Sequence, residues 1–294
     1  MKEISGITAF ITGGASGIGL GIGKALARHG AQVMLSDIDS TTLEKAAQDF
    51  PGEAGTVVLD VRDRKQWSDA RAATEARFGP VGILVNNAGI MNEGTSANYK
   101  EHSLVTQSAD SFDRMIAINL TGVFNGIHEF GPGMAERGEG HIVNTSSSQG
   151  LISCGGVGAY CAAKFGVVGM SEALQQELAH RGVGVSVLCP GVTQTNLPNS
   201  TARLVGLPEI EMPEGFGMST DIVGQQVVDA ILANELYIIT HGEYVVPIAQ
   251  RHARIMAAAA RMPVSPIYNP HAPLPGTPEF AEFVAHGGKP AGEG

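Results

Sequence analysis

The amino-acid sequence predicts an α/β fold in which helices cover both faces of a parallel sheet. Short apolar runs alternate with longer segments of helical periodicity over most of the 294 residues, as repeated βαβ units require. Runs such as AQVML and VSVLC are continuously apolar, which is typical of strands buried on both faces. Right-handed crossovers between such strands place the helices on both faces of one sheet.

The expected elements alternate along the chain. The expected strands are residues 7–11, 32–36, 56–59, 83–85, 141–145, 183–188 and 236–240. The expected helices are residues 18–29, 42–50, 64–78, 112–130, 159–180 and 221–233. We expect one domain over residues 1–242, because α/β sheets often run past about 200 residues as one unit. Residues 243–294 are expected to form an extension that begins as a helix and continues as a Pro-rich tail.

The composition argues against several classes of protein. A formal net charge of −10 disfavours nucleic acid or an anionic membrane as a partner, because both need a basic surface. The three cysteines are no disulfide framework, so a reducing, cytoplasmic location is expected. No apolar stretch reaches the roughly 18–20 residues of a membrane span, and the first residues lack the pattern of a signal peptide. The histidines show no metal-ligand spacing, so no metal is expected.

The first expected strand runs into a glycine-rich segment, ITGGASGIG. Gly13, Gly17 and Gly19 stand where the strand must turn sharply into a helix, and glycine lets the backbone approach a pyrophosphate. The N–H groups at the start of the helix can bind that anion, and Ser16 can add a hydroxyl contact. Ile18 belongs to the same predicted cofactor loop. The alternative is a turn that only packs, because the spacing differs from G-x-G-x-x-G.

An acidic residue, Asp37, lies at the end of the second expected strand, in LSDID. A carboxylate at about this distance from the glycine loop binds the adenosine ribose, and its charge repels a 2′-phosphate. No Arg or Lys lies between residues 31 and 42, and Ser16 occupies a position where a basic residue could hold that phosphate. NAD is therefore favoured over NADP. The alternative is that Asp37 only caps the next helix, a role that suits Asp39 or Ser40 better.

The segment AYCAAKFG places Tyr160 and Lys164 four residues apart, on one face of a helix. A free phenol titrates near pH 10, which is too high for acid–base chemistry at neutral pH. An ammonium group about 4 Å away contributes roughly 4 kcal/mol at an effective dielectric near 20, enough to lower the phenol pKa by about three. The pair therefore predicts a general acid–base tyrosine, although the spacing alone often occurs by chance.

Further motifs stand in order around this pair. LVNNAG contains residues 86–89, INLTGVF contains Asn119, IVNTSSSQG contains Ser147, and CPGVTQT contains residues 190–195. With the glycine loop, their order and spacing resemble the short-chain dehydrogenase/reductase family over roughly residues 3–240. The resemblance implies a Rossmann-type doubly wound sheet, a nicotinamide cofactor and a small-molecule alcohol or ketone as substrate.

The resemblance also implies roles for individual residues. Tyr160 would exchange the proton, Ser147 would bind the substrate oxygen, Lys164 would hold the nicotinamide ribose, and Asn119 would hold a water that links Lys164 to solvent. Ser147 is preferred over its serine neighbours because it lies thirteen residues before Tyr160. The implied cofactor-binding residues are Gly13, Ser16, Gly17, Ile18, Gly19, Asp37, Asp60, Val61, Asn87, Gly89, Tyr160, Lys164, Thr193 and Thr195.

The chain departs from the family pattern in two places. Thr193 stands where Val or Ile is usual, which leaves a backbone contact with the nicotinamide carboxamide possible. Residues 243–294 extend beyond the usual family end, which puts the familiar tetramer packing in doubt. A homo-oligomer, either dimer or tetramer, is still expected.

We expect an NAD-dependent oxidoreductase that interconverts an apolar or aromatic secondary alcohol and its ketone. Residues 196–219 follow a strand end, where ligands bind in such sheets, and include Leu197, Leu204, Leu207, Met212, Phe216 and Met218. The tail and NELYIITHGEY are loosely similar to bacterial family members that act on aryl-propane alcohols from lignin; steroid-like and terpenoid alcohols stay open. The alternatives are a 3-oxoacyl-thioester reductase, which would usually prefer NADP, and a dinucleotide-binding regulatory protein without turnover.

Overall fold

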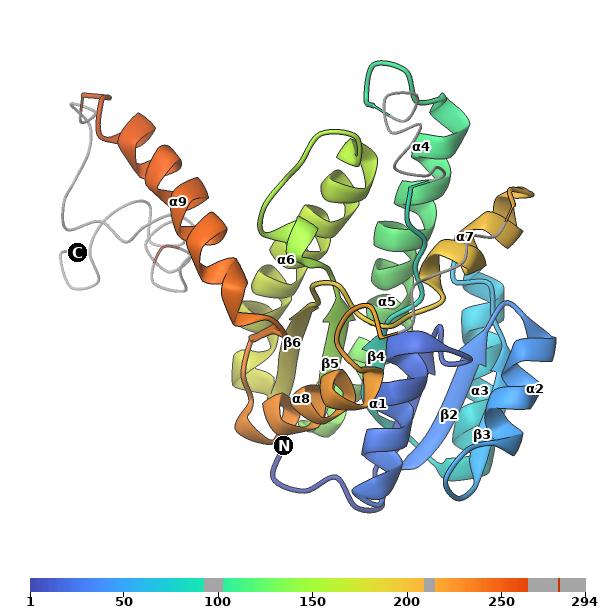
Figure 1. Ribbon diagram of the computed structural model, residues 1–294. Coiled ribbons are helices and arrows are strands. Elements are labelled where there is room, and N and C mark those ends of the chain that lie inside the picture. The colour runs from blue at the N-terminus through green and yellow to red at the C-terminus, as the bar shows by residue number, and fades with distance from the viewer. Residues whose placement is uncertain (93–102, 209–214, 264–279, 281–294) are drawn as a thin grey trace, which may run out of the picture. The chain divides into compact units, whose positions relative to one another are not determined.

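The computed structural model describes residues 1–92, 103–208, 215–263 and 280. The chain divides into two units, residues 1–244 and residues 245–294, and each is described by itself. Figure 1 shows the predicted sheet in the first unit. Within the described ranges, no helix combines the length and the apolar character needed to cross a bilayer.

The first unit is built on a seven-stranded sheet in the order β3-β2-β1-β4-β5-β6-β7. The strands are β1 (Thr8–Thr12), β2 (Gln32–Asp37), β3 (Ala54–Val58), β4 (Val81–Asn86), β5 (Gly140–Thr145), β6 (Val183–Cys189) and β7 (Tyr237–Ile239). All neighbouring strands are parallel, so their carboxyl ends lie at one edge. The strand order reverses at β1 and β4, the switch point where ligands bind in open α/β sheets. The predicted Rossmann-type α/β fold is confirmed.

Helices cover both faces of this sheet (Figure 1). The α-helices in the described part of this unit are α1 (Gly17–Arg28), α2 (Ser40–Gln48), α3 (Arg64–Phe78), α4 (Ala109–Ile116), α5 (Gly122–Arg137), α6 (Gly158–Leu178), α7 (Leu197–Val205) and α8 (Thr220–Ala233). Helices α1 and α8 pack against each other, and α3 packs against α5.

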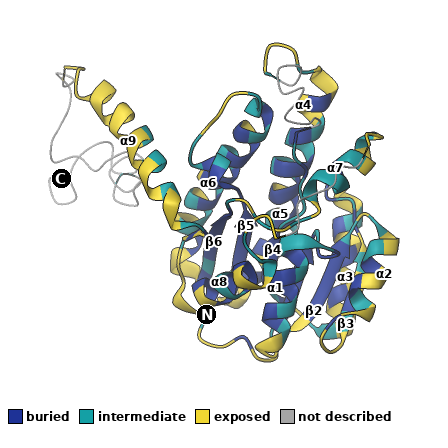
Figure 2. Cartoon of the chain, viewed as in Figure 1, coloured by how far each residue is buried: buried dark blue, intermediate teal, exposed yellow. Residues whose placement is uncertain are grey.

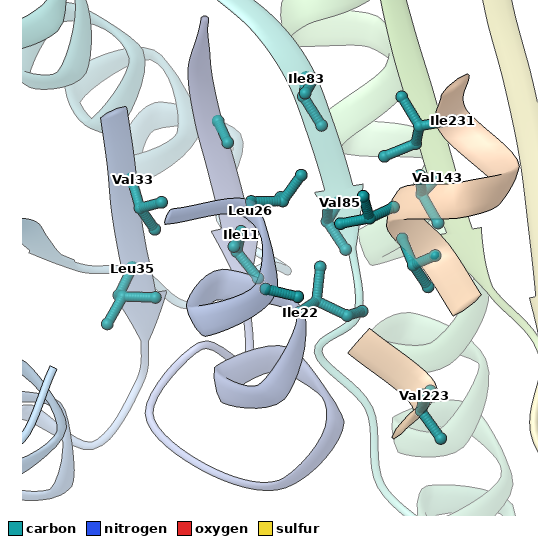
Figure 3. Packing of buried hydrophobic residues seen from close by; sticks show 14 of the residues in the cluster. Ile11, Ile22, Leu26, Val33, Leu35, Ile83, Val85, Val143, Val223 and Ile231 are labelled. Atoms are coloured by element: carbon teal, nitrogen blue, oxygen red, sulfur yellow. The ribbon is translucent and has the colours of Figure 1, made fainter. Parts of the chain in front are cut away.

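Adjacent residues of one strand pack into hydrophobic cores on opposite faces of the sheet. Ile11 of β1 packs in a core with Ile22 of α1, part of which Figure 3 shows. The preceding residue, Phe10, packs in a second core, where its ring lies 5.9 Å from that of Trp67 and 5.0 Å from that of Phe130. Figure 2 shows the central strands, such as β4 and β5, buried between the two helical layers. Because both faces are buried, the strands read as continuous apolar runs.

Two segments differ from the sequence prediction. The helix expected over 112–130 is α4, a π-helical turn at Ala117–Thr121 and then α5. The substrate segment 196–219, expected as a loop, contains the helix α7. Pro198 stands in the first turn of α7, where a missing N–H costs nothing, and Gly206 ends the helix with φ of 72°. Apolar periodicity showed neither the π-helical turn nor this short helix.

The second unit contains helix α9 (Val245–Ala259). Val245, Val246, Ile255 and Met256 are exposed on it. The Pro-rich tail predicted after Met262 lies almost wholly outside the described residues. That residues 243–294 form a separate extension stays a prediction.

Candidate active site

A cleft of about 420 Å³ opens at the carboxyl edge of the sheet, beside the ends of β1, β2, β4 and β5 and against α7. The predicted site residues that line it are Gly13, Ser16, Gly17, Ile18, Asp37, Asp60, Val61, Asn87, Gly89, Tyr160, Lys164 and Thr195. Four other predicted residues, Gly19, Asn119, Ser147 and Thr193, are described but do not belong to this lining. The fold thus gathers residues from six separate motifs around one cavity.

The glycine turn leaves room for a bound group beside the start of α1. Gly13 has φ of 62°, a conformation that side chains rarely adopt. A Cβ on Gly19 would lie 2.2 Å from the carbonyl oxygen of Gly13, so this position requires glycine. Ser16 precedes α1, and its side chain makes no capping hydrogen bond to the helix. The first N–H groups of α1 and the Ser16 hydroxyl are therefore placed to bind a pyrophosphate.

The Asp37 carboxylate stands at the end of β2 and faces the same cleft. It accepts hydrogen bonds from the backbone N–H of Ala15, at 3.3 Å, and of Asp39, at 3.2 Å. Burial is the main influence on its pKa and raises it, while these hydrogen bonds oppose the rise. The capping role belongs to Asp39, whose side chain accepts from the N–H of Thr42 at 3.1 Å. Asp37 is therefore not needed as the cap of α2.

Asp60 and Val61 follow β3 and line the cleft. The Asp60 carboxylate accepts from Arg62, with Nε 2.9 Å from Oδ1, and these hydrogen bonds are the main reason that its pKa is lowered. The Val61 carbonyl accepts from the indole N–H of Trp67 at 2.9 Å. This loop is thus fixed before any ligand binds.

Two arginines reach the cleft that the sequence analysis did not single out. Arg62 follows β3, and Arg203 lies on α7. The charge of Arg203 is one of the smaller influences that lower the pKa of Asp39. Residues 31–42 contain no Arg or Lys, but the cleft nevertheless contains these two cationic side chains. No local motif marks either arginine, because only the folded chain brings them to β2.

The Asn87 side chain ties the end of β4 to the glycine turn. Its Nδ2 donates to the carbonyl oxygens of Thr12, at 3.1 Å, and Gly13, at 3.3 Å. Two residues later, a Cβ placed on Gly89 would lie 3.1 Å from Asn119 Oδ1 and 3.6 Å from Lys164 Nζ. Gly89 is therefore the point at which the Asn119 and Lys164 side chains converge.

Asn119 lies in the π-helical turn and is fully buried. Its Oδ1 accepts from the N–H of Ile90 at 2.8 Å, and its Nδ2 donates to the carbonyl of Ile90 at 2.7 Å. This pair of bonds fixes the turn against the segment after β4. The predicted water link from Asn119 to Lys164 stays a prediction, although the amide is already occupied by backbone partners.

The Tyr160 and Lys164 side chains lie together on α6. Lys164 Nζ is 5.6 Å from the centre of the Tyr160 ring and donates to the Thr145 carbonyl at 3.0 Å. Lys164 is only 4% exposed, and burial lowers its pKa to about 8. Burial also raises the pKa of Tyr160, opposed by a hydrogen bond with Ser147. The expected fall in the Tyr160 pKa was therefore wrong for the free protein, because desolvation outweighs the hydrogen bond that lowers this pKa.

The three adjacent serines occupy different positions. Ser146 Oγ donates to the Lys164 carbonyl at 2.8 Å, which fixes the backbone of α6. Ser147 Oγ accepts from the N–H of Gln149 at 3.2 Å and forms the hydrogen bond with Tyr160. Ser148 begins the 3₁₀ turn Ser148–Gly150. Ser147 is thus the serine whose hydroxyl meets the phenol.

The segment after β6 closes the side of the cleft nearest the glycine turn. Thr195 lines it, and a Cβ on Gly17 would lie 3.3 Å from the Thr195 side chain. The Thr193 hydroxyl donates to the Gly191 carbonyl at 3.2 Å. The described lining residues on and beside α7 are Asn196, Leu197, Ser200, Arg203 and Leu204.

The methionines and the phenylalanine of residues 196–219 differ in where their side chains lie. Met218 packs against the core and pairs with Thr193, and it does not line the cleft. Phe216 is 53% exposed and does not line it either. Met212 lies outside the described residues. The apolar side chains that do line this part are Leu197 and Leu204.

Several known proteins resemble this chain. C alpha-dehydrogenase of Sphingobium sp. strain SYK-6 is 31% identical over 284 residues, which are 90% of each chain. The structure of a short chain dehydrogenase/reductase from Burkholderia phymatum in complex with NAD is 29% identical, covers 92% of this chain and all of that one, and has a TM-score of 0.78. EphD of Mycobacterium tuberculosis is 38% identical over 195 residues, but the match spans only 32% of its length.

The short chain dehydrogenase family itself matches residues 7–203, from β1 to α7. This range contains the described residues that line the cleft except Leu204. The chain belongs to the short-chain dehydrogenase family of oxidoreductases.

Proposed function

We propose that this protein is an NAD-dependent oxidoreductase that interconverts a secondary alcohol and a ketone, with Tyr160 as the general acid–base group. One observation carries the proposal. The Tyr160 phenol, bonded to Ser147 and lying beside Lys164, lines the same cleft as the glycine turn and Asp37. The cleft therefore holds a proton-transfer group within reach of a dinucleotide site.

The residues of the cleft fit a dinucleotide. The glycine turn is too tight for side chains, Ser16 keeps its hydroxyl out of helix capping, and Asp37 faces the adenosine end. When bound, the oxidised cofactor supplies the hydride acceptor and a positive charge near the phenol. Lys164 would hold the nicotinamide ribose, and Thr195 and the backbone at Thr193 would orient the carboxamide.

Proton transfer is the task of the chain's own residues. In alcohol oxidation, Tyr160 accepts the hydroxyl proton while Ser147 donates a hydrogen bond to the substrate oxygen. In ketone reduction, Tyr160 returns the proton. Lys164, with a pKa of about 8, is largely charged at neutral pH and favours the tyrosinate. General acid–base assistance of this kind is typically worth about 10²–10⁴-fold in rate.

Asp37 supports NAD as the preferred cofactor. Its carboxylate is fixed by two backbone N–H groups, and a 2′-phosphate beside it would meet a partly buried negative charge. Arg62 and Arg203 in the cleft favour the opposite choice. Arg62 is already neutralised by Asp60, so we infer that Asp37 dominates the preference.

The substrate we propose is an apolar or aromatic secondary alcohol, or the corresponding ketone. Leu197 and Leu204 give the α7 side of the cleft an apolar surface. The likeness to C alpha-dehydrogenase extends over 90% of the chain and so includes the substrate segment. A homo-oligomer in the cytoplasm stays part of the proposal.

The test is an absorbance assay of nicotinamide reduction and oxidation with a panel of aryl, terpenoid and steroid alcohols and ketones. Tyr160→Phe should lower turnover by about 10²–10⁴-fold and leave NAD affinity, measured by titration, nearly unchanged. Tyr237→Phe is the matched control, because Tyr237 bonds to Glu172 and does not line the cleft.

Each rival predicts a different result. Best activity on a 3-oxoacyl thioester with NADPH would favour the thioester reductase. Tight dinucleotide binding without turnover on any substrate would favour a regulatory protein. An active Tyr160→Phe variant would remove Tyr160 from the mechanism.

A further inference from the structure

Two thiols beside the acid–base tyrosine share a single hydrogen-bond acceptor. Cys154 Sγ donates to the Gln149 side-chain oxygen at 3.2 Å, and Cys161 Sγ donates to the same oxygen at 3.5 Å. The two sulfur atoms are therefore no further apart than the sum of these lengths. Gln149 in turn donates its backbone N–H to Ser147, and Cys161 follows Tyr160 directly. Both thiols thus adjoin the proton-transfer residues.

The segment that carries Cys154 contains two adjacent glycines, Gly155 and Gly156. Residues 151–157 join the Ser148–Gly150 turn to α6, and Cys154 is exposed there, whereas Cys161 is buried in the first turns of α6. Among the described residues, a Cβ on Gly155 would meet nothing within 4 Å, and Gly156 has φ of 82°. These glycines let the exposed thiol move toward the buried one without rearranging the helix.

We propose that Cys154 and Cys161 form a redox-active thiol pair that takes a small-molecule disulfide as its oxidant and lowers turnover when oxidised. The loss of turnover rests on the proposed function; the formation of the disulfide does not. Oxidation removes both thiol donors from Gln149, whose backbone positions Ser147. It also encloses Tyr160 in a small covalent ring between residues 154 and 161. Residues that bind the adenosine end, such as Asp37, are not in this ring.

The chemistry is thiol–disulfide exchange. The exposed Cys154 thiolate attacks a disulfide such as oxidised glutathione, forms a mixed disulfide and releases one thiol. The Cys161 thiolate then attacks the Cys154 sulfur, forms the internal disulfide and releases the second thiol. The protein loses two electrons and two protons, and the oxidant is reduced to two thiols.

The thiols of this chain differ in reactivity. Burial is the main influence that raises the pKa of Cys154, so the first step is faster at mildly alkaline pH. Cys189 is fully buried, and burial raises its pKa to about 12. Cys189 is therefore an internal control that should not react in the folded protein.

The experiment incubates the full chain with oxidised glutathione at about pH 8.5 and follows mass, NAD affinity and turnover. We expect the loss of two hydrogens and a peptide linking Cys154 to Cys161. For the best substrate, kcat/KM should fall about tenfold or more, because a small misplacement of reacting groups can cost 10²-fold. NAD affinity should change little, and dithiothreitol should restore turnover.

Cys154→Ser should form no disulfide and keep its turnover under oxidant, Cys161→Ser should stop at the mixed disulfide on Cys154, and Cys189→Ser should respond like the parent protein. Failure to form the Cys154–Cys161 bond in folded protein would overturn the proposal. A disulfide that leaves kcat/KM unchanged in an active enzyme would overturn its regulatory part. If the reduced protein has no turnover on any alcohol, the proposed function fails, and the mass measurement still decides whether the thiol pair exists.

Discussion

A buried basic side chain lies at each end of strand β5, and the two side chains differ in their charge at neutral pH. At the amino end, His141 is fully buried, and burial lowers its pKa to about 3. At the carboxyl end, the Thr145 carbonyl accepts from Lys164, whose pKa burial lowers to about 8. At neutral pH, His141 is therefore neutral and Lys164 is largely charged.

The hydrogen bonds of His141 explain how its neutral form is accommodated. Ser186 Oγ donates to the Glu235 carbonyl at 2.6 Å and lies 2.8 Å from His141 Nε2. Because the hydroxyl has only one proton, His141 Nε2 is the donor to Ser186 and Nδ1 carries no proton. Nδ1 has no partner among the described residues, so a second proton there would be an unpaired buried charge.

The comparison shows at which edge of the sheet a buried charge lowers the free energy of unfolding. A shift of the lysine pKa from 10.5 to about 8 corresponds to about 3 kcal/mol of destabilisation at neutral pH. The histidine avoids such a cost by remaining neutral. The carboxyl edge, where the cleft lies, carries the charge, and the amino edge does not.

The largest effect is expected at Lys164. Lys164→Met should lower turnover by about 10²–10⁴-fold, since it removes the charge that favours the tyrosinate. The free energy of unfolding at pH 7 should nevertheless rise by about 1–3 kcal/mol, because a buried charge is replaced by an apolar chain. Steady-state kinetics and urea unfolding measure the two effects.

The pH dependence of stability provides a control for that variant. The folded pKa of Lys164, about 8, is below the unfolded value of 10.5, so the unfolded chain binds more protons between these values. Stability of the parent protein therefore rises with pH in this window, and this contribution should be missing from Lys164→Met. If Lys164→Met is both inactive and less stable than the parent protein at pH 7, the lysine charge does not lower the stability of the parent, and the comparison with His141 is wrong.

At the other end of β5, the effect should appear in acid. The folded pKa of His141 is about 3 and the unfolded value is 6.5, so the unfolded chain binds the proton first as the pH falls. Stability should decrease by about 3 kcal/mol between pH 6.5 and 4 from this group alone. His141→Leu should remove that contribution at a cost of about 1 kcal/mol at pH 7. Equal acid sensitivity of variant and parent in urea titrations would refute this assignment.

Ser186→Ala should have a smaller effect at the same end. It leaves His141 Nε2 and the Glu235 carbonyl without their shared hydroxyl, which should reduce the free energy of unfolding by about 2 kcal/mol. The kcat should stay the same, because Ser186 does not line the cleft. A change in kcat at unchanged stability would mean that the amino edge contributes to catalysis.

The sequence was sufficient for the parts of this molecule that depend on local pattern. Strands buried on both faces appear as apolar runs, the motifs around Gly13 and Ser147 stand at strand ends, and the Tyr160 motif reads as a helix, so the fold and the cleft could be expected. The positions of Arg62 and Arg203 could not be expected, because these residues reach the cleft only in the folded chain. The sequence also could not predict the direction in which the Tyr160 pKa shifts, since this shift depends on how deeply the phenol is buried.

The smallest expected effect lies at Asp37, a partly buried charge at the carboxyl edge. Asp37→Asn keeps an acceptor for the backbone N–H groups but removes the charge that repels a 2′-phosphate. The ratio of kcat/KM for NAD to that for NADP should fall about tenfold, or about 1.4 kcal/mol. Stability should not fall, because burial already raises the pKa of Asp37 and so disfavours its charged form. Asp39→Asn is the matched control: it removes a charge near β2, keeps an N-cap oxygen for α2 and should leave the ratio unchanged. If Asp39→Asn changes the ratio as much as Asp37→Asn does, the preference comes from the summed charge near β2 and not from a specific contact with Asp37.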